Sequence, residues 1–407
     1  MNPYKVIYEQ FFDEASFLWE LRSTAVDLPD YNAEALNEIE QRIDIQLDGL
    51  MVAVEDAWPI CLEALTQEES GGVFTSAIIA FRSHDTAKIQ KAVEVGLSND
   101  EAVRGLISAL GWLPGKLVHP WVKKFFSSKD LDHKYLALAA CSVRRENPAE
   151  HLNRMLDRDD CKEHEKLYAR ALRLIGELKR QDLILVLLEA VKSDDENIKF
   201  WSNWSRILLG DHSALENLEA FIFENGPFQH KAINIAFRVL PMELARKWIT
   251  RLVDNKEQIR AAVKSTGVLG DPHAVNWLIK IMQDPSIARI SAESFGLITG
   301  IDLEARGLIL EDPSNIAMLP NEEDDVSLNE DENLPWPDVD KLSKLWINEG
   351  VNFVSGQRYF MGQPISPESV RYRLNNAYQR QRHAAALELS LSDSVIPLQN
   401  TRARVQP

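Results

Sequence analysis

The sequence predicts an all-α fold, an α-solenoid of about seven helical hairpins with a helical cap before the array and a helical extension after it. The main observation is a segment rich in small residues that recurs about every 27 to 34 residues between residues 70 and 300. Such a period is typical of stacked helical hairpins. Within each repeat, apolar residues stand three and four positions apart, as in amphipathic helices. A helical bundle with accidental spacing is the alternative, and seven consecutive intervals disfavour it. The recurring segments have anchors at Phe81, Gly111, Ser142, Gly176, Gly210, Leu240, Gly267 and Gly296.

Residues 1–70 are expected to form the cap. Two apolar stripes, in residues 11–19 and 35–50, are separated by Leu28-Pro29-Asp30. A first hairpin without a neighbour would expose its apolar face to water, so a capping element is expected. Gly71 and Gly72 are expected to separate this cap from the array.

Residues 71–310 are expected to form the array, and its pattern is clearest after Gly267. A turn at Gly270-Asp271-Pro272 precedes an apolar helix, and a second turn at Asp284-Pro285 precedes a helix of small residues. Asp is a favoured N-cap residue, and Pro is tolerated in the first turn of a helix. Small residues are expected in the second helix because neighbouring hairpins approach closely there.

This unit resembles the short form of the HEAT repeat, which has an Asp in the inter-helix turn and an Arg five or six residues later. The matching pairs here are Asp254 with Arg260 and Asp284 with Arg289. The resemblance implies that each pair bridges successive repeats and that the helix after the Asp lines the concave face.

The composition changes sharply after the array. Residues 311–333 contain two acidic runs with almost nothing apolar between them, so we expect a mobile linker. Residues 334–407 are expected to form the helical extension. In it Leu334-Pro335-Trp336-Pro337-Asp338 favours an extended, docked segment, because each proline restricts the chain around it.

A last helix is expected from about Pro367 to Leu391, with a basic polar side. Two interpretations stay open for this helix. It docks on the acidic solenoid or linker, or it binds an acidic partner surface. The basic residues are Arg371, Arg373, Arg380 and Arg382.

The net charge of −17 and the pI near 5.1 argue against a nucleic-acid partner, because neutralising phosphates requires clustered Lys and Arg. The same argument weighs against the HEAT-like DNA glycosylases, which depend on a basic concave surface. No run is long and apolar enough for a membrane span and the N-terminus has no secretory signal, so we expect a cytoplasmic protein. Cys61, Cys141 and Cys161 are odd in number and widely spaced, which predicts buried thiols without disulfides.

No catalytic, cofactor-binding or metal-binding residue is predicted. His164-Glu165 is the one His-Glu dipeptide, whereas HEAT-like di-iron hydroxylases use several, and there is no HExxH motif. The segment from Gly111 to Leu117 lacks the spacing and the hydroxyl residue of a phosphate loop and is interpreted as a helix end stopped by Pro114. Nothing marks a tetrapyrrole pocket of the kind that phycobilin lyases would need.

The best candidates for a partner-binding surface are Trp201 and Trp204. They stand three residues apart on a helix that should line the concave face and is normally built from small residues. Trp is enriched at interface hot spots, although most Trp residues of a solenoid lie between its layers.

Motifs in the cap and the extension resemble those of an uncharacterised family of bacterial HEAT-repeat proteins associated with type VI secretion loci. They are Phe17-Leu18-Trp19, Arg42-Ile43-Asp44, Leu47-Asp48-Gly49-Leu50, Leu334-Pro335-Trp336-Pro337-Asp338, Gly356-Gln357-Arg358-Tyr359, Gly362-Gln363-Pro364 and residues 379–388. The resemblance implies a role in loading or accompanying secretion cargo.

We therefore expect a non-enzymatic scaffold or adaptor that binds a protein partner, such as a type VI effector or spike component. Solenoids suit this role because they offer a long preformed surface. Two alternatives stay open: an immunity protein whose acidic groove neutralises a basic toxin, and an enzyme built on a HEAT scaffold.

Overall fold

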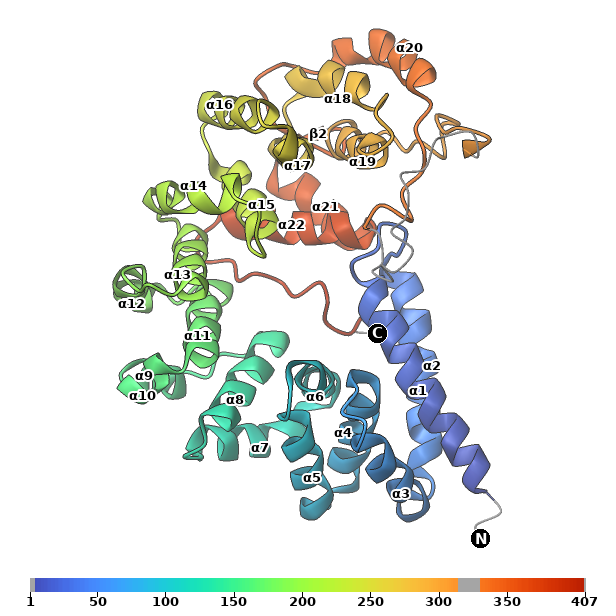
Figure 1. The fold of residues 1–407 in the computed structure, drawn as a ribbon, viewed down its shortest axis with the longest axis vertical. Coiled ribbons are helices and arrows are strands. Elements are labelled where there is room, and N and C mark those ends of the chain that lie inside the picture. The colour runs from blue at the N-terminus through green and yellow to red at the C-terminus, as the bar shows by residue number, and fades with distance from the viewer. Residues whose placement is uncertain (1–3, 314–329, 406–407) are drawn as a thin grey trace. The chain divides into compact units, whose positions relative to one another are not determined.

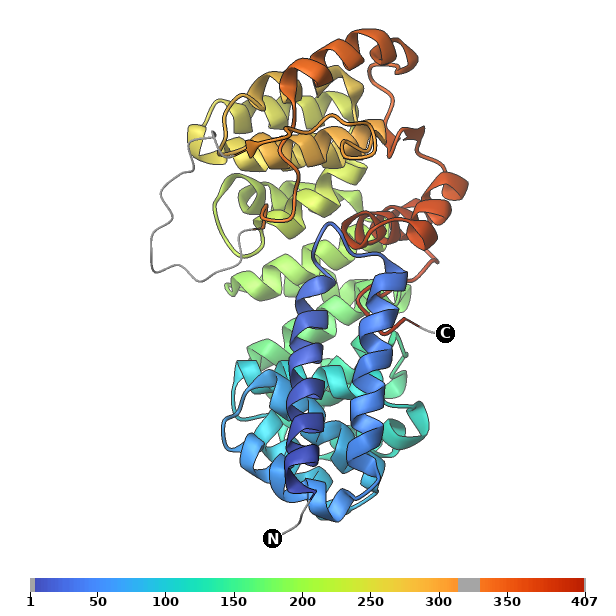
Figure 2. The same ribbon diagram turned by 90° about the vertical axis from the view of Figure 1, so that its right-hand side faces the viewer.

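The computed structural model describes residues 4–313 and 330–405, and it confirms the predicted all-α, solenoid-like fold. The described residues form 22 α-helices and one two-stranded hairpin (Figures 1 and 2). The chain divides into two compact units. Within the described residues, the first comprises 4–205, 378–380 and 397–405, and the second comprises 206–313, 330–377 and 381–396. This division interrupts the predicted array after Ser205 and shares the predicted extension between the two units.

The first unit is a series of helical hairpins. Its α1 and α2 lie side by side as the predicted cap, in blue in Figure 2. Its elements are α1 (Lys5–Ala25), α2 (Ala33–Met51), α3 (Val54–Leu65), α4 (Ser70–Ser83), α5 (Thr86–Gly96), α6 (Asp100–Trp112), α7 (Gly115–Ser127), α8 (Leu131–Arg144), α9 (Glu150–Leu156), α10 (Asp159–Glu163), α11 (Glu165–Glu177), η1 (Gln181–Leu183), α12 (Ile184–Ala190) and most of α13 (Glu196–Leu208). Gly71 and Gly72 lie inside α4 and therefore do not separate the cap from the array.

Local sequence explains where these helices begin and end. Asn32, Asp85, Asn99 and Asp130 each accept a hydrogen bond from a main-chain N–H of the helix that follows. These side chains satisfy amides that a helix start leaves unpaired. Pro114 separates α6 from α7, as predicted.

One face of the first unit is built from five helices that are separated in the sequence by other helices. Helices α4, α6, α8 and α11 pack in that order, and α13 follows α11 through the contact of Gly176 with Ser205. We call this the inner face. A Cβ at Gly105 would lie 2.1 Å from the carbonyl oxygen of Ser70, and one at Gly176 would lie 2.7 Å from the Cα of Ser205. The predicted close approach at small residues is therefore present in the first unit.

The second unit continues the hairpin pattern and adds most of the C-terminal extension. Its core surrounds Phe295 and Trp346, whose ring centroids are 6.0 Å apart. The elements are the end of α13, η2 (His212–Ala214), α14 (Leu215–Phe223), α15 (Gln229–Val239), α16 (Met242–Val253), η3 (Lys256–Gln258), α17 (Ile259–Leu269), η4 (Pro272–Ala274), α18 (Val275–Ile281), α19 (Ala288–Thr299), α20 (Val339–Glu349), η6 (Gly350–Asn352), β1 (Tyr359–Phe360), β2 (Gln363–Pro364), α21 (Pro367–Asn376) and α22 (Gln379–Ser392).

The β1–β2 hairpin covers the ends of α17 and α19. The amide of Tyr359 donates to the carbonyl of Gly270 at 2.8 Å. Gly270 and Gly300 both have positive φ, and a Cβ at either would overlap the hairpin main chain. Glycine is therefore required there for both conformation and space. The predicted last helix is wrong in one respect, because the chain breaks at residues 377–378 into α21 and α22.

The segment from Glu330 to Asp338 docks on the second unit. Asp331 is buried and pairs with Arg260 at 2.6 Å, and the amides of Leu310 and Asp338 complete main-chain hydrogen bonds between 308–310 and 336–338. The extended, docked segment after residue 334 is thus confirmed. Of the predicted linker, residues 330–333 contact α17 and α19 through Arg260 and Arg289, and residues 314–329 lie outside the described structure.

Candidate functional site

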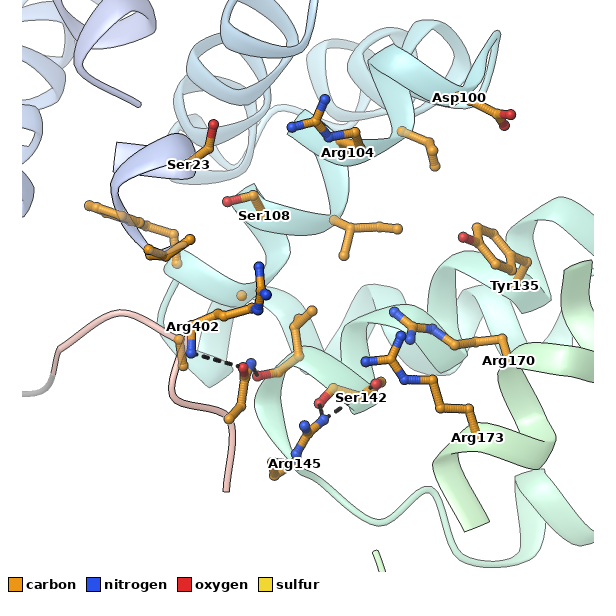
Figure 3. Close-up of a pocket in the computed structure, with 18 of the residues that line it drawn as sticks. Ser23, Asp100, Arg104, Ser108, Tyr135, Ser142, Arg145, Arg170, Arg173 and Arg402 are labelled. Carbon is orange, nitrogen blue, oxygen red and sulfur yellow. Dashed lines mark hydrogen bonds between the residues drawn. The ribbon is translucent and has the colours of Figure 1, made fainter. Parts of the chain in front are cut away.

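A cavity of about 670 Å³ lies on the inner face of the first unit (Figure 3). The C-terminal part of α1, the helices α6, α8 and α11, the start of α13 and residues 400–404 surround it. Its volume is within the range of about 300–1,000 Å³ that is usual for ligand pockets. Stacking of the hairpins therefore brings residues from five helices to one place.

The cavity is basic although the chain is acidic. Eight of its lining residues are Arg or Lys, and Asp100 is the one acidic residue among them. The net charge of the chain is −17, so this concentration of positive charge is a local property of the fold. The basic residues are Arg22, Arg104, Arg145, Lys166, Arg170, Arg173, Arg402 and Arg404.

Three of these arginines surround one buried carboxylate. Glu177, at the end of α11, has no exposed surface and accepts a hydrogen bond from the Ser142 hydroxyl at 2.5 Å. Arg173 Nε donates to it at 2.8 Å, and Arg145 Nη1 lies 3.0 Å from it. Arg170 extends from the same helix, and its guanidinium lies beside that of Arg173 in Figure 3. Arg170 interacts electrostatically with Glu177, and its buried Nε has no hydrogen-bond partner in the described structure. We call Arg145, Arg170 and Arg173 the arginine cluster.

The arginine cluster has more positive charge than Glu177 neutralises. Burial alone would raise the pKa of Glu177, yet Arg173, Arg145, Arg170 and the Ser142 hydroxyl together lower it. Burial lowers the pKa of Arg170 to about 10, and the charge of Arg173 acts in the same direction. A guanidinium with that pKa is still charged near neutral pH. Three cations facing one carboxylate leave two formal positive charges at this wall of the cavity.

The main chain at Arg145 has a conformation that favours glycine. Arg145 follows α8 with a φ of 54°, whereas the corresponding residue after α17 is Gly270, with a φ of 74°. A positive φ is unfavourable for a residue with a Cβ. Arg145 therefore brings a guanidinium beside Glu177 from a left-handed position that glycine occupies at the end of α17.

At the other end of the cavity, each arginine faces an acidic partner. Arg22 Nη2 donates to Glu40 at 2.8 Å in a buried pair. Arg402 pairs with Asp27, and Arg404 pairs with Asp44. The excess positive charge is therefore concentrated at the arginine cluster.

Residues 397–405, which we call the tail, lie along this inner face without forming a helix or strand. Most of the hydrogen bonds that hold the tail use its main-chain atoms. At its start, the Leu398 amide donates to the Glu177 carbonyl at 2.9 Å, and Arg145 Nε donates to the Leu398 carbonyl at 2.6 Å. Further along, Gln379 donates to the Thr401 carbonyl at 3.1 Å, Arg22 donates to the carbonyls of Arg402 and Ala403, and the Val405 amide donates to Glu40 at 2.9 Å. One side chain of the tail also takes part, because Asn400 donates to the Val143 carbonyl at 2.8 Å.

The two tryptophans predicted to bind a partner have different surroundings. Trp201 is 9% exposed, lines the cavity and has the Arg173 guanidinium 4.5 Å from its ring centroid. Trp204 is 6% exposed and packs edge-on against Trp201, with centroids 5.3 Å apart. Trp201 thus borders the candidate site, and Trp204 lies in the layer behind it.

The four basic residues predicted on one helix lie on two helices. Arg371 is exposed on α21, and Arg373 donates to the Met361 carbonyl at 3.0 Å. Arg380 donates to the Asp27 carbonyl at 2.9 Å, and Arg382 donates to the Leu374 carbonyl at 3.0 Å. Three of the four therefore bind main-chain oxygens of the chain itself, and none of them lines the cavity.

The predicted bridges between turn aspartates and arginines are replaced by other contacts. Arg260 pairs with Asp331 and Glu330, and Arg289 donates to the Leu334 carbonyl at 2.7 Å. Asp284 accepts hydrogen bonds from Ser286 within its own turn, and Asp254 is the residue that follows the last residue of α16. The HEAT resemblance therefore identified arginines that anchor the segment after residue 330, but not their partners.

Other candidates for chemistry have structural explanations. All three cysteines are buried and free, as predicted, and burial raises the pKa of Cys61 and of Cys141 to about 12. His164 Nδ1 accepts from the Leu167 amide at 3.3 Å, so this residue caps α11. In residues 4–313 and 330–405, no group of three or more His, Cys, Asp or Glu residues could hold a metal ion, and no helix could cross a bilayer.

The arginine cluster was not among the sequence predictions. Arg170 and Arg173 have the spacing of residues on one helix face, which is usual for solvated positions. One signal was available, because Arg145 follows the Ser142 anchor by three residues, as Gly270 follows Gly267.

A comparison with models of known protein families and a comparison with curated proteins both find no match to this chain.

Proposed function

We propose that the protein is a non-enzymatic binding scaffold whose inner face holds a non-helical peptide segment of a partner protein. The observation that supports this most directly is the tail. The inner face already binds nine residues of non-helical chain, largely through their main-chain atoms. Main-chain hydrogen bonds do not depend on side-chain identity, so a partner segment with a different sequence could use the same donors and acceptors.

The basic cavity beside the tail supplies the second half of the proposal. A partner segment along the inner face would place its side chains next to Arg145, Arg170 and Arg173. Arginine forms strong, directional hydrogen bonds with anionic groups. We therefore propose that the partner segment carries acidic groups. The proposed partner segment is acidic, whereas the immunity hypothesis requires a basic toxin as the partner.

A peptide-binding experiment tests the proposal. A chain that ends at Ile396 lacks the tail, and a labelled synthetic peptide of residues 397–407 is titrated into it while fluorescence anisotropy is recorded. We expect saturable binding to the shortened chain and at least tenfold weaker binding to the full chain, whose face is occupied. Binding that is absent, or that a scrambled peptide reproduces, would contradict the proposal.

The identity of the partner requires a second experiment. The resemblance to proteins associated with type VI secretion makes a secretion effector or spike component a candidate. Both chain lengths serve as bait in extracts of the source organism, and captured proteins are identified by mass spectrometry. A partner of the inner face should be enriched on the shortened chain and released by the peptide of residues 397–407. Proteins that the peptide does not release would not support an adaptor role for this face.

A further inference from the structure

The arginine cluster has features of a site for a doubly charged anion. Its three guanidinium groups come from the end of α8 and from α11, and the one carboxylate among them, Glu177, is fully buried. Glu177 therefore fixes Arg173 and Arg145 by direct contacts. Arg145 also donates to the Leu398 carbonyl through Nε and to the Ser142 carbonyl through Nη1, so the N–H groups of its Nη2 stay available for another acceptor. Arg170 Nε has no hydrogen-bond partner among the described residues.

The charge balance indicates the kind of anion. Three arginines and one glutamate leave two positive charges. The neighbouring cations do not change this balance, because Lys166 pairs with Asp100 at 2.5 Å and Arg104 pairs with Glu101 at 3.2 Å. A phosphomonoester carries up to two negative charges near neutral pH and has three acceptor oxygens, whereas a carboxylate carries one charge and has two oxygens.

We propose that Arg145, Arg170 and Arg173 bind a phosphomonoester group in its dianionic form. The proposal rests on the binding role proposed above for the inner face and specifies the ligand chemistry at that site. The phosphate group has two possible sources, a phosphorylated side chain of a partner segment or a small phosphorylated molecule. Each source presents the same terminal oxygens to the cluster, and the volume of about 670 Å³ accommodates either.

Titration calorimetry on the full chain, with its tail in place, tests the inference. The probes are inorganic phosphate, free O-phosphoserine and a nine-residue peptide with a central phosphoserine. A matched peptide that carries glutamate in place of the phosphoserine is the comparison. We expect the phosphorylated probes to bind and the glutamate peptide to bind at least tenfold more weakly at pH 7.5. The phosphopeptide and free O-phosphoserine are also titrated into the chain that ends at Ile396, because the tail occupies the face that a partner segment would use. In that chain, tighter binding of the phosphopeptide would assign the phosphate to a protein, and equal binding of free O-phosphoserine would assign it to a small molecule. Absence of binding by all three phosphorylated probes, or equal binding of the glutamate peptide, would overturn the inference.

A pair of variants localises the binding. Arg170→Gln removes the arginine that makes no hydrogen bond to Glu177, so the fold should persist, and we expect phosphate binding to weaken about tenfold or more. Arg104→Gln is the control, because Arg104 lines the same cavity but pairs with Glu101 on its own helix. Equal losses in both variants would contradict a site at the arginine cluster.

The pH dependence provides an independent criterion. The second pKa of a phosphomonoester is about 6, so the dianion gives way to the monoanion as the pH falls below that value. Affinity for O-phosphoserine should therefore fall between pH 7.5 and pH 5. A pH-independent affinity would exclude the dianion. Failure of these tests leaves the tail-peptide experiment unaffected, since that experiment uses the shortened chain and a probe without phosphate.

Discussion

At the residue scale, the first unit depends on glycines that allow two helices to touch. A Cβ at Gly105 would lie 2.1 Å from the Ser70 carbonyl oxygen and 3.0 Å from the Phe74 amide nitrogen, and both of these are main-chain atoms of α4. Main chain cannot rotate away as a flexible side chain does. The inner face, and with it the cavity, therefore requires that α4 and α6 keep this separation.

A pair of glycine substitutions tests this requirement. Gly105→Ala should lower the free energy of unfolding by about 1–3 kcal/mol, because α6 must move away from α4. Gly72→Ala is the matched control, since its Cβ would meet nothing closer than 3.6 Å and lies within a helix. That variant should be stabilised by about 0.5–1 kcal/mol, because alanine loses less conformational freedom than glycine. Urea unfolding followed by circular dichroism measures both changes. A neutral Gly105→Ala would show that the helices tolerate separation.

Individual residues also show where sequence reasoning succeeded and where it did not. Asp271 was expected to cap a helix and does so, because that hydrogen bond involves neighbours two residues apart. The contacts of Arg145 with Leu398 depend on residues 253 positions apart and follow no periodic pattern. A single side chain bonded to a distant carbonyl leaves no signal in the sequence, and this is why the cavity was not predicted.

At the element scale, the segment 330–338 is held by ion pairs from α17. Lys264 donates to Glu330 at 2.8 Å, and Arg260 pairs with both Glu330 and Asp331. The two prolines around Trp336 predicted an extended chain, but the arginines were assigned to turn aspartates. The position of Arg260 on a helix was therefore predictable from the sequence. Its partners Glu330 and Asp331 were not, because they come close to Arg260 only in the folded second unit.

This segment should release as the solution is acidified. The hydrogen bond from Lys264, together with Arg260, lowers the pKa of Glu330 from 4.5 to about 2. A carboxyl whose pKa is lowered by folding stabilises the docked state above its ordinary pKa, and the contribution is lost as pH falls through the folded value. Protection factors for the amides of Leu310 and Asp338, from hydrogen exchange, should therefore decrease between pH 4.5 and pH 2.

The matched variants for this prediction are Glu330→Gln and Glu332→Gln. The first should reduce protection already at pH 7 and remove most of the pH dependence, because glutamine cannot form the ion pairs. The second should behave as the parent chain, since the Glu332 side chain is exposed and the contact of this residue with Arg289 uses the main-chain carbonyl. A parent-like Glu330→Gln would assign the docking to Asp331 and the apolar contacts instead.

At the scale of the whole molecule, the repeat period predicted stacked helical hairpins and the structure contains them. The period did not predict that the chain would divide after Ser205, or that residues 378–380 and 397–405 would join the first unit. Periodicity reports contacts between neighbours in the sequence, whereas Arg145, Val143 and Arg22 contact the tail across 253, 257 and 380 positions. Residues 378–380 and 397–405 therefore form part of the same compact unit as residues 4–205.

Removal of the tail should consequently destabilise the first unit alone. In a chain that ends at Ile396, Glu177, Arg22 and Glu40 lose hydrogen bonds to the tail, while the contacts of α17 and α19 stay intact. Each bond contributes about 0.5–1.5 kcal/mol, offset in part by the regained freedom of nine residues. Hydrogen exchange with mass spectrometry should show faster exchange in α1, α2 and α8 and unchanged exchange in α17 and α19. A chain ending at Val405 retains the whole tail and is the control. Faster exchange in both units would mean that the tail stabilises the whole molecule, and no change in α1, α2 or α8 would mean that the bound tail contributes nothing to the fold.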